Sequence, residues 1–289
     1  MRDLNYSLKQ LGERNRDGSI KTQAQRGRML SLIANQLQKS GFRHLKQADQ
    51  LRTKHVTALV ERWQREELSA GTMKNRLSVM RWWAEKVGRS SVIPRDNDKL
   101  GIARRVYVSD QSKAQELSRE ALAKVGDQHV RMSLELQAAF GLRREASMKF
   151  IPNYADKGDR IVLKASWTKG GKAREIPIRT QAQRDVLDRA HKLAAGGSLV
   201  PPARLYVQQE KIYERHCVRA GLFKMHGLRH AYAQQRYNEL MGCKCPHQGG
   251  PKSKELTPEM KAKDHEVRLI ISRELGHERE QIIAQYIGR

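Results

Sequence analysis

The sequence predicts a mainly α-helical protein of two domains, the second of which contains a small antiparallel β hairpin. Apolar residues recur at helical spacing through most of the 289 residues, which is enough chain for two domains of ordinary size. A polar stretch without sustained periodicity, residues 88–108, separates the two helical regions. A β-rich stretch over residues 160–167 is followed by two glycines and a second such stretch over residues 173–178, which is typical of a hairpin.

The charge balance indicates a polyanionic partner, of which nucleic acid is the commonest. Lys and Arg number 56 against 31 Asp and Glu, so the formal net charge is +25 and the pI is near 10.3. Residues 1–105 carry +13 of this charge and residues 106–289 carry +12. Two basic parts suit a protein that contacts a duplex from two sides, whereas a generally basic solvated surface is the plainer alternative.

The composition disfavours several classes of protein. The sequence has no apolar run of 18 residues that could span a bilayer, and its first ten residues lack the apolar core of a secretion signal. Three cysteines cannot form a disulfide framework, which fits a reducing compartment. We therefore expect a cytoplasmic, nucleoid-associated protein that binds DNA and has no membrane partner.

The first domain is expected to be helical. Residues 1–20 mix charged residues with glycine and asparagine and are predicted to form a flexible basic arm. The domain itself is predicted over residues 21–93, with amphipathic helices over residues 22–39, 54–65 and 73–87. Lys74, Arg76 and Arg81 on the third helix are candidates for contacts with DNA phosphates, with a solvated helix face as the alternative.

The second domain is expected to follow a linker. The linker is predicted over residues 94–112, where Pro94 and Gly101 interrupt regular structure, and the domain over residues 113–289. Its hairpin is expected to turn at Gly170 and Gly171. Its helices are predicted over residues 118–125, 128–140, 180–195, 206–220, 226–241, 258–275 and 278–286.

Four segments of the second domain carry residue types that could cleave a phosphodiester without a metal. They are FGLRRE around Arg143, WTKGGKAREIPI around Lys169, MHGLRHAYA around His226 and Arg229, and LGHEREQIIAQY, which contains His277 and Tyr286. Each segment alone has a structural explanation, such as a surface cation, a hairpin-tip charge, a helix cap or a core tyrosine. Their combination in a basic protein favours a catalytic interpretation.

The chemistry assigns a role to each of these residue types. A phosphodiester under attack gains negative charge on its non-bridging oxygens, which the guanidinium groups of Arg143 and Arg229 can clamp. Tyr286 can attack phosphorus, but a phenol with a pKa of ~10 needs a base to accept its proton, and His226 is the candidate. The leaving 5′ oxygen needs a proton, which Lys169 on the glycine hairpin could donate.

Together with His277, which can donate a hydrogen bond to the same phosphate, these residues resemble the signature of the tyrosine recombinases of the phage integrase family. That signature is Arg, Lys, His-x-x-Arg, His or Trp, and Tyr, and it matches, in family order, Arg143, Lys169, His226, Arg229, His277 and Tyr286. The resemblance extends from about Thr22 to the end of the chain and is weaker in the first domain. It implies a helical core-binding (SAM-like) domain followed by a mostly α catalytic domain.

The resemblance also implies an activity. The chain is expected to cut and rejoin DNA through a 3′-phosphotyrosine intermediate, for integration or excision of a phage or mobile element. It is expected to act as a homotetramer on two double-stranded attachment sites, without a metal or other cofactor. A host DNA-bending or directionality factor is a further candidate partner. Lys172, Arg174 and His230, which neighbour the matched positions, are expected to contact DNA.

Two other functions remain as alternatives. A type IB topoisomerase shares this catalytic chemistry but acts as a monomer, and the helical first domain and the TKGGK hairpin favour the recombinase over it. A non-catalytic DNA-binding relative is the second alternative. The complete set of matched residues argues against it, because a relative without activity is expected to have lost at least one of them.

The sequence departs from the family pattern near two of the matched positions. Ala146 stands three residues after Arg143, where the family often carries an acidic residue, so the group that orients Arg143 is open. Gly227 stands where Asp is common, which is tolerable because that side chain is not catalytic. Three residues follow Tyr286. Many relatives dock a longer tail on a neighbouring subunit, so that contact is expected to be reduced or made elsewhere.

Residues 242–266 lengthen the gap between Arg229 and His277 and are expected to form a flexible basic loop. A zinc site is the alternative for this stretch. However, a C-x-C pair is a poor chelator for a tetrahedral site, so no metal site is predicted. The side chains concerned are Cys243, Cys245, His247 and His265.

Overall fold

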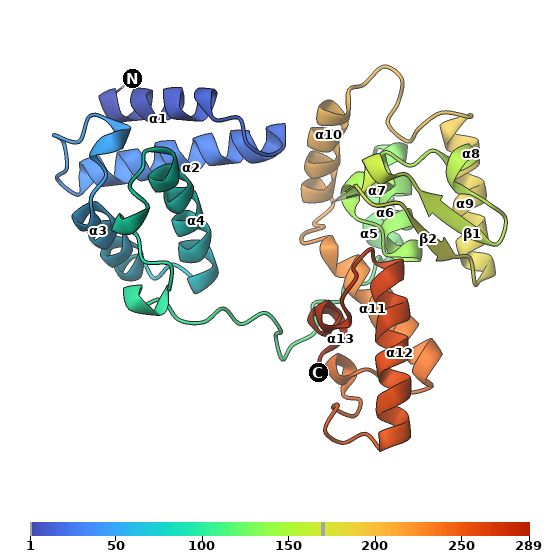
Figure 1. The fold of residues 1–289 in the computed structure, drawn as a ribbon. Helices are drawn as coiled ribbons and strands as arrows, with labels where there is room; N and C mark the ends of the chain where they lie inside the picture. Colours follow the sequence, from blue (N-terminus) through green and yellow to red (C-terminus); the bar gives the residue numbers. More distant parts are fainter. Residues whose placement is uncertain (1, 169–170) are drawn as a thin grey trace. The chain divides into compact units, whose positions relative to one another are not determined.

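The computed structural model describes residues 2–168 and 171–289, which form two compact units, Met1–Val106 and Tyr107–Arg289 (Figure 1). The described residues are mainly helical and include one two-stranded antiparallel sheet, as the sequence predicts. Each unit has its own apolar core. Among the helices described, none is long and apolar enough to cross a membrane.

The first unit packs its helices around two buried tryptophans. The indole N–H of Trp63 donates to the Gln36 side chain at 2.9 Å, and that of Trp83 donates to the Ala48 carbonyl at 2.8 Å, so neither buried ring leaves an unpaired donor. The elements are α1 (Asp3–Arg14), α2 (Ile20–Lys39), η1 (Ala48–Gln50), α3 (Thr53–Arg65), α4 (Ala70–Lys86), η2 (Ser90–Val92) and η3 (Asp98–Leu100). The three predicted helices correspond to α2, α3 and α4.

The start of the chain differs from the flexible arm predicted for residues 1–20, because Asp3–Arg14 form helix α1. Leu4 and Leu8 are buried in the core of the first unit, and α1 packs along α2. Burial of these side chains stabilises a segment that its charges alone would leave loose. The signal was present in the sequence, since Leu4, Leu8 and Leu11 recur at helical spacing.

The second unit is built around α6 and α11, which pack against each other. Its elements are α5 (Arg119–Ala123), α6 (Gln128–Phe140), α7 (Arg144–Met148), α8 (Pro152–Ala155), β1 (Arg160–Leu163), η4 (Ala165–Trp167), β2 (Arg174–Pro177), α9 (Gln181–Ala194), α10 (Tyr206–Arg219), α11 (His226–Met241), η5 (Pro246–Gln248), α12 (Pro258–Glu274), η6 (Glu280–Ile282) and α13 (Ala284–Ile287). Strands β1 and β2 pair antiparallel, with Arg160 opposite Pro177 and Leu163 opposite Arg174.

Two predicted elements of this unit are shorter than expected. The first strand ends at Leu163, and the chain then forms η4 so that Trp167 is buried beside Phe150. The helix predicted over residues 278–286 is broken into η6 and α13. This break turns the chain back onto the core, where Ile283 and Tyr286 are buried.

The connection between α11 and α12 is anchored, in contrast to the flexible loop predicted for residues 242–266. Cys245 is buried in the core of the second unit, and its backbone N–H donates to the Asn238 side chain at 3.0 Å. Helix α12 begins at Pro258, where the Thr257 hydroxyl accepts a hydrogen bond from the Met260 N–H. The non-α-helical part of this connection is called the 242–257 segment below.

Candidate active site

A glycine turn positions Arg143. Helix α6 ends at Gly141, which has a left-handed φ of 59°, and Arg143 is the N-cap of α7. A Cβ placed on Gly141 would lie 2.6 Å from Cδ1 of Tyr232 and 3.1 Å from Cδ2 of Leu275. A side chain at this position would therefore push the turn away from α11 and the end of α12. Glycine allows the close approach that brings Arg143 to the site.

Arg229 lies fully buried on the first turns of α11 and joins three parts of the unit. Its Nη1 donates to the Gly141 carbonyl at 2.5 Å, its Nη2 donates to the Leu275 carbonyl, and its Nε donates to the Tyr286 hydroxyl at 3.4 Å. Burial lowers the pKa of Arg229 to about 10, so the guanidinium stays charged at neutral pH.

His277 reaches the site from the turn that follows α12. Gly276 in this turn has a φ of 66°, and a Cβ on it would lie 2.4 Å from Nη1 of Arg174. The Nε2 atom of His277 lies 3.3 Å from the Tyr286 hydroxyl and 3.4 Å from Nη2 of Arg143. A guanidinium can only donate, so this contact requires a lone pair on Nε2. Burial, followed by the charges of Arg229 and Arg143, lowers the pKa of His277 to about 4, which agrees with a neutral ring.

Tyr286 is 5% exposed and lies on α13. Among the described residues, the hydrogen-bond partners of its hydroxyl are Arg229 and His277. Its ring centroid lies 4.6 Å from that of His230, and its backbone carbonyl accepts from the Gln234 side chain at 2.9 Å. The tyrosine is therefore held at its ring, its hydroxyl and its backbone.

His226 lies next to this arrangement without a hydrogen bond to the Tyr286 hydroxyl. It is the first residue of α11, and its ring centroid is 6.0 Å from that of Tyr286. His226 is exposed, and partial desolvation by its neighbours, followed by the charges of Arg229 and Arg143, lowers its pKa and favours its neutral form. Of the two histidines, His277 is the one in contact with the hydroxyl.

Arg174 belongs to the same cluster, which the sequence reasoning did not foresee. It was expected to contact DNA from the hairpin, but it is 8% exposed and its Nη1 donates to the Leu275 carbonyl at 2.7 Å. Burial, followed by the charges of Arg229 and Arg143, lowers its pKa to about 9. Three guanidinium groups thus share one buried region, and each disfavours the charge of the others.

Several donors of this cluster are unpaired. Nη1 of Arg143 and both Nε and Nη2 of Arg174 are buried and have no hydrogen-bond partner in the described part of the chain. A buried charged donor without a partner is costly, typically by a few kcal/mol, so such groups call for an explanation. An anion with several acceptor oxygens would satisfy them together.

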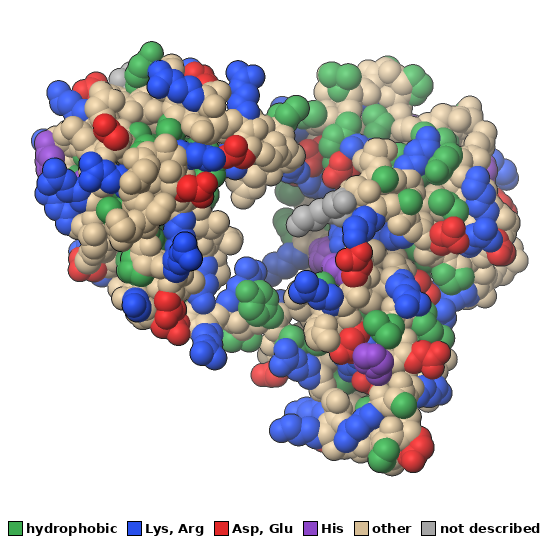
Figure 2. Space-filling model, in the orientation of Figure 1, with side chains coloured by type: hydrophobic (Ala, Val, Ile, Leu, Met, Phe, Trp, Pro, Cys, Tyr) green, Lys and Arg blue, Asp and Glu red, His purple; other side chains and the backbone are tan. Residues whose placement is uncertain are grey.

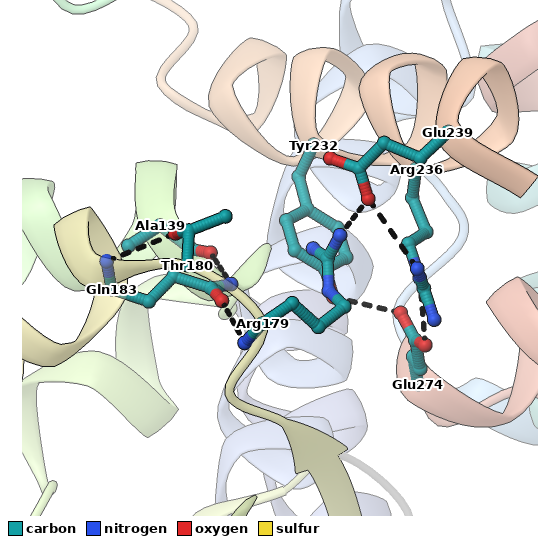
Figure 3. Close-up of polar contacts among 8 residues, drawn as sticks. All are labelled: Ala139, Arg179, Thr180, Gln183, Tyr232, Arg236, Glu239 and Glu274. Atoms are coloured by element: carbon teal, nitrogen blue, oxygen red, sulfur yellow. Dashed lines mark hydrogen bonds and ion pairs between the residues drawn. The ribbon is translucent and has the colours of Figure 1, made fainter.

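A polar network joins Tyr232 to the charged side chains of Arg179, Arg236, Glu239 and Glu274 (Figure 3). The Tyr232 hydroxyl, whose ring packs against Gly141, donates to the buried Glu274 carboxylate at 2.7 Å. Burial raises the pKa of Tyr232, which keeps this hydroxyl protonated. Arg236 pairs with the same carboxylate at 3.0 Å and with Glu239, and Glu239 also pairs with Arg179. The network ties the start of α9 to α11 and α12.

The remaining predicted DNA contacts in this unit are in different environments. Lys172 is exposed and pairs with Glu278. His230 is 7% exposed and packs against the Tyr286 ring, and its contact with DNA stays a prediction. Lys169 lies outside the described residues. No group of three or more His, Cys, Asp or Glu side chains that could hold a metal occurs in residues 2–168 and 171–289.

In the first unit, Lys74 is half-buried on α4, and Arg76 lies with Cζ 5.3 Å from the centroid of the Trp63 ring. Arg81 donates to the Pro94 carbonyl at 2.7 Å and to the Asn97 side chain at 2.9 Å. Burial lowers the pKa of both arginines. Arg81 therefore connects α4 to residues 94–97, and its contact with DNA phosphates stays a prediction.

Comparisons with known proteins give the family of both units. A family model described as "Phage integrase, N-terminal" matches residues 1–93, and one described as "Integrase" matches residues 102–235. No curated protein matches the chain by sequence.

Solved structures with the same fold include a lambda integrase dimer bound to a COC' core site, with a TM-score of 0.62 and 15% identity over 98% of this chain and 76% of that one. The Tn1549 transposon integrase in complex with circular intermediate DNA has a TM-score of 0.57 and 13% identity over 100% and 96% of the two chains. The XerH site-specific recombinase bound to difH has a TM-score of 0.55 and 14% identity over 98% and 80%.

The two family matches cover most of both units and include Arg143, His226 and Arg229, while His277 and Tyr286 lie beyond residue 235. The similarity in fold extends over nearly the whole chain. The chain belongs to the phage integrase family of tyrosine recombinases, enzymes that cut and rejoin DNA in site-specific recombination.

Proposed function

We propose that this chain recombines double-stranded attachment sites through a 3′-phosphotyrosine link to Tyr286, in the integration or excision of a phage or mobile element. The observation that carries the proposal is the place of the Tyr286 hydroxyl, 3.4 Å from Nε of Arg229 and 3.3 Å from Nε2 of His277, beside unpaired guanidinium donors. A nucleophile next to donors that lack an anion suits attack on a phosphodiester.

The attack forms a bond between Tyr286 Oη and phosphorus and breaks the bond to the 5′ oxygen. Negative charge then develops on the non-bridging oxygens, where the unpaired N–H groups of Arg143 and Arg174 can donate to it. The phenol proton passes to a neighbouring histidine. His277 is the better placed acceptor, because it is neutral and already contacts the hydroxyl. The negative phosphate offsets the nearby cations and so raises the basicity of this ring.

The departing 5′ oxygen needs a proton to leave as an alcohol. We assign this proton to Lys169, for which the support is the TKGGK motif, since Lys169 lies outside the described residues. Lys172, three residues further on, is less suited because its ammonium group pairs with Glu278. In the rejoining step the proton movements reverse, and a 5′ hydroxyl displaces the tyrosine.

The DNA partner and the assembly follow from charge and from the relatives. Lys and Arg side chains are spread over the visible face of each unit, so both can contact phosphates (Figure 2). Lambda integrase, a structure of similar fold, has been solved as a tetramer bound to a Holliday junction. By analogy, we propose a homotetramer on two attachment sites, with a host DNA-bending or directionality protein as a possible additional partner.

The test is the covalent adduct. A pool of nicked duplexes with a randomised core sequence is incubated with the protein, and adducts that survive denaturation are digested and mapped by mass spectrometry. The nick releases a short fragment after cleavage, so rejoining is prevented and the adduct accumulates. We expect the modified peptide to contain Tyr286, with phosphorus attached through the phenol oxygen.

Two tyrosine variants give the matched comparison. Tyr286→Phe removes one hydroxyl and should bind the duplex pool yet form no adduct. Tyr154→Phe alters a tyrosine that is 39% exposed elsewhere in the same unit and should form adducts at the parental rate. Undiminished adducts in Tyr286→Phe, or a parent protein that forms none on any duplex, would overturn the proposal.

A further inference from the structure

The 242–257 segment and the last residues of the chain pack against each other. Helix α13 is in contact with η5, the short helix inside this segment. A Cβ placed on Gly288 would lie 2.9 Å from Cβ of Pro246 and 2.9 Å from Cδ2 of His247. With a φ of 87°, Gly288 has the left-handed backbone that glycine adopts without strain. The backbone next to Tyr286 therefore lies directly on η5, with no room for a side chain between them.

His247 adds a specific polar contact to this packing. Its Nδ1 lies 3.0 Å from the backbone carbonyl oxygen of Tyr286, and its Nε2 lies 2.8 Å from the carbonyl oxygen of Ser109. Carbonyl oxygens only accept, so a neutral ring donates to one of them and the cationic ring donates to both. The contact falls on the residue that we propose as the nucleophile, at a carbonyl oxygen three covalent bonds from its Cβ.

Two further residues hold the same stretch of backbone. The Gln234 side chain on α11 donates to the Tyr286 carbonyl at 2.9 Å, and Nη1 of Arg268 on α12 donates to the Gly288 carbonyl at 3.1 Å. Arg268 is itself fixed by Asp264 at 2.7 Å. Three side chains outside the catalytic cluster, one each from η5, α11 and α12, thus contact the backbone from Tyr286 to Gly288.

The segment is able to act as a support because it is itself fixed. Its anchor is Cys245, which is buried and bonded through its N–H to Asn238 on α11. The Asn238 amide also donates to Gln248 at 2.8 Å, which closes η5 onto the same helix. His247 therefore projects from a base that is bonded to α11, the helix that carries Arg229.

We propose that the 242–257 segment is a seat, formed within the same chain, for the residues that carry Tyr286, and that His247 is its positioning residue. This inference rests on the proposed function. The hydrogen bonds of the His247 ring are with the Tyr286 and Ser109 carbonyls and not with the Tyr286 hydroxyl or the arginine cluster. His247 therefore acts through the backbone. Misplacing a nucleophile by about 1 Å can cost ~10²-fold in rate, which sets the scale of the effect.

The first test measures rate and affinity separately. His247→Ala removes both ring contacts, and His247→Gln keeps one amide donor of similar reach. We expect His247→Ala to slow single-turnover adduct formation on saturating nicked duplex by ~10- to 10²-fold, with an unchanged Kd for that duplex, and His247→Gln to recover part of the rate. Ser253→Ala, an exposed position of the same segment, is the control and should keep the parental rate.

A second pair of variants tests the seat without altering His247. Gly288→Ala places a methyl group against Pro246 and His247, whereas Gly249→Ala, with a φ of 82° in the same segment, meets nothing within 4 Å. Gly249 has a ψ of 13° and Gly288 a ψ of −178°, so Gly288→Ala adds a larger backbone strain to the contact with η5, and both effects displace the residues next to Tyr286. Gly288→Ala should slow adduct formation well below Gly249→Ala at saturating DNA.

The outcomes separate this inference from the proposed function. Parental adduct rates in both His247→Ala and Gly288→Ala would overturn the seat and leave the recombinase proposal standing. A loss of rate in His247→Ala that is matched by a loss of DNA affinity, with no recovery in His247→Gln, would also overturn it. A parent protein without adducts overturns the proposed function and the seat together.

Discussion

Arg229 contacts both the hydroxyl and the ring of Tyr286: its Nε donates to the hydroxyl at 3.4 Å, and its Cζ lies 5.7 Å from the ring centroid. The same guanidinium is bonded to the Gly141 and Leu275 carbonyls. One side chain therefore serves both the packing of the unit and the environment of the hydroxyl. Arg143, by contrast, has an unpaired Nη1 and a contact with His277.

This difference predicts different outcomes for the two arginines. Arg229→Ala leaves the Gly141 carbonyl without this donor, at a cost of about 1–3 kcal/mol for the group left unsatisfied, and leaves the Leu275 carbonyl with Arg174 as its donor, so the melting temperature should fall clearly. Arg143→Ala removes a charge that disfavours its cationic neighbours Arg174 and Arg229, so the melting temperature should hold or rise. Both should lose ~10²–10³-fold in adduct formation.

Thermal melts and single-turnover cleavage of the two proteins check this prediction side by side. Arg144→Ala, which removes the neighbouring ion pairs with Glu210 and Glu214, controls for loss of charge near the same turn. Equal destabilisation by Arg143→Ala and Arg229→Ala would contradict the assignment of separate roles.

Gly227 gives a prediction against the family pattern. A Cβ at this position would lie 2.6 Å from Cγ of Gln115 and 2.8 Å from the backbone oxygen of Lys113. Gly227→Asp, which places the family's common residue here, should therefore displace the segment before α5 and cost about 1–3 kcal/mol in the free energy of unfolding. Chemical denaturation of the variant measures this cost.

The matched control is Gly27→Ala on helix α2, where a Cβ meets nothing within 4 Å. It should stabilise the protein by about 0.5–1 kcal/mol, because alanine favours a helix interior over glycine. A Gly227→Asp protein as stable as the parent would mean that residues 113–115 do not pack on α11 as described.

His55 predicts an acid-sensitive first unit. It is buried, its Nδ1 accepts from the Arg52 N–H at 3.1 Å, and burial lowers its pKa to about 4. The histidine of the unfolded chain has a pKa near 6.5. Between about pH 4 and pH 6.5 the unfolded chain therefore binds more protons than the folded chain. Stability should fall as the pH drops from about 6.5 towards 4, by up to about 1.4 kcal/mol per pH unit for this group.

Melting temperatures at pH 7.5 and pH 5.0 test the effect. His55→Gln offers an acceptor oxygen to Arg52 but cannot take up the proton, so its melting temperature should change less between the two pH values. His230 and His277, whose pKa values are each lowered to about 4, make a similar contribution in both proteins. An identical pH dependence in the parent and the variant would exclude His55 as a source.

The site predicts that each subunit uses its own tyrosine, because the Arg229 and His277 that flank Tyr286 belong to the same chain. A mixture of Arg143→Ala and Tyr286→Phe proteins should therefore form no more adduct than either alone. The control is the parent protein mixed with either variant at the same ratio, which gives the adduct yield of assemblies that contain intact subunits. Recovery of adduct in the mixture would place the nucleophile in a neighbour's site.

The sequence is sufficient to predict what depends on local patterns. Helices α2, α3 and α4 follow apolar periodicity, and the residue types and spacing around Arg143, Arg229, His277 and Tyr286 predict a common site. In the structure, Arg143, Arg229 and Tyr286 meet around His277. The order of the four motifs along the chain predicts this common site, although no single residue among them does.

Contacts between distant segments were not predictable in the same way. Arg174 shares the buried face of β2 with Ile176, which strand alternation could have indicated, but its bond to the Leu275 carbonyl depends on tertiary packing. The basic composition of residues 242–266 favoured a flexible loop, and nothing in the local sequence shows that Cys245 is buried or that His247 meets Tyr286. Both results depend on residues 39 or more positions away in the chain or on the fold as a whole.

The Leu275 carbonyl oxygen accepts hydrogen bonds from Arg174 on β2 and from Arg229 on α11. One oxygen atom thus couples the thermal motions of the hairpin, the central helix and the turn that carries His277. None of these three elements can move far by itself without breaking a buried hydrogen bond from a guanidinium group. The amides of Gly276 and His277, both bonded within this turn, should therefore exchange with solvent in large cooperative openings of the unit and not by local fraying.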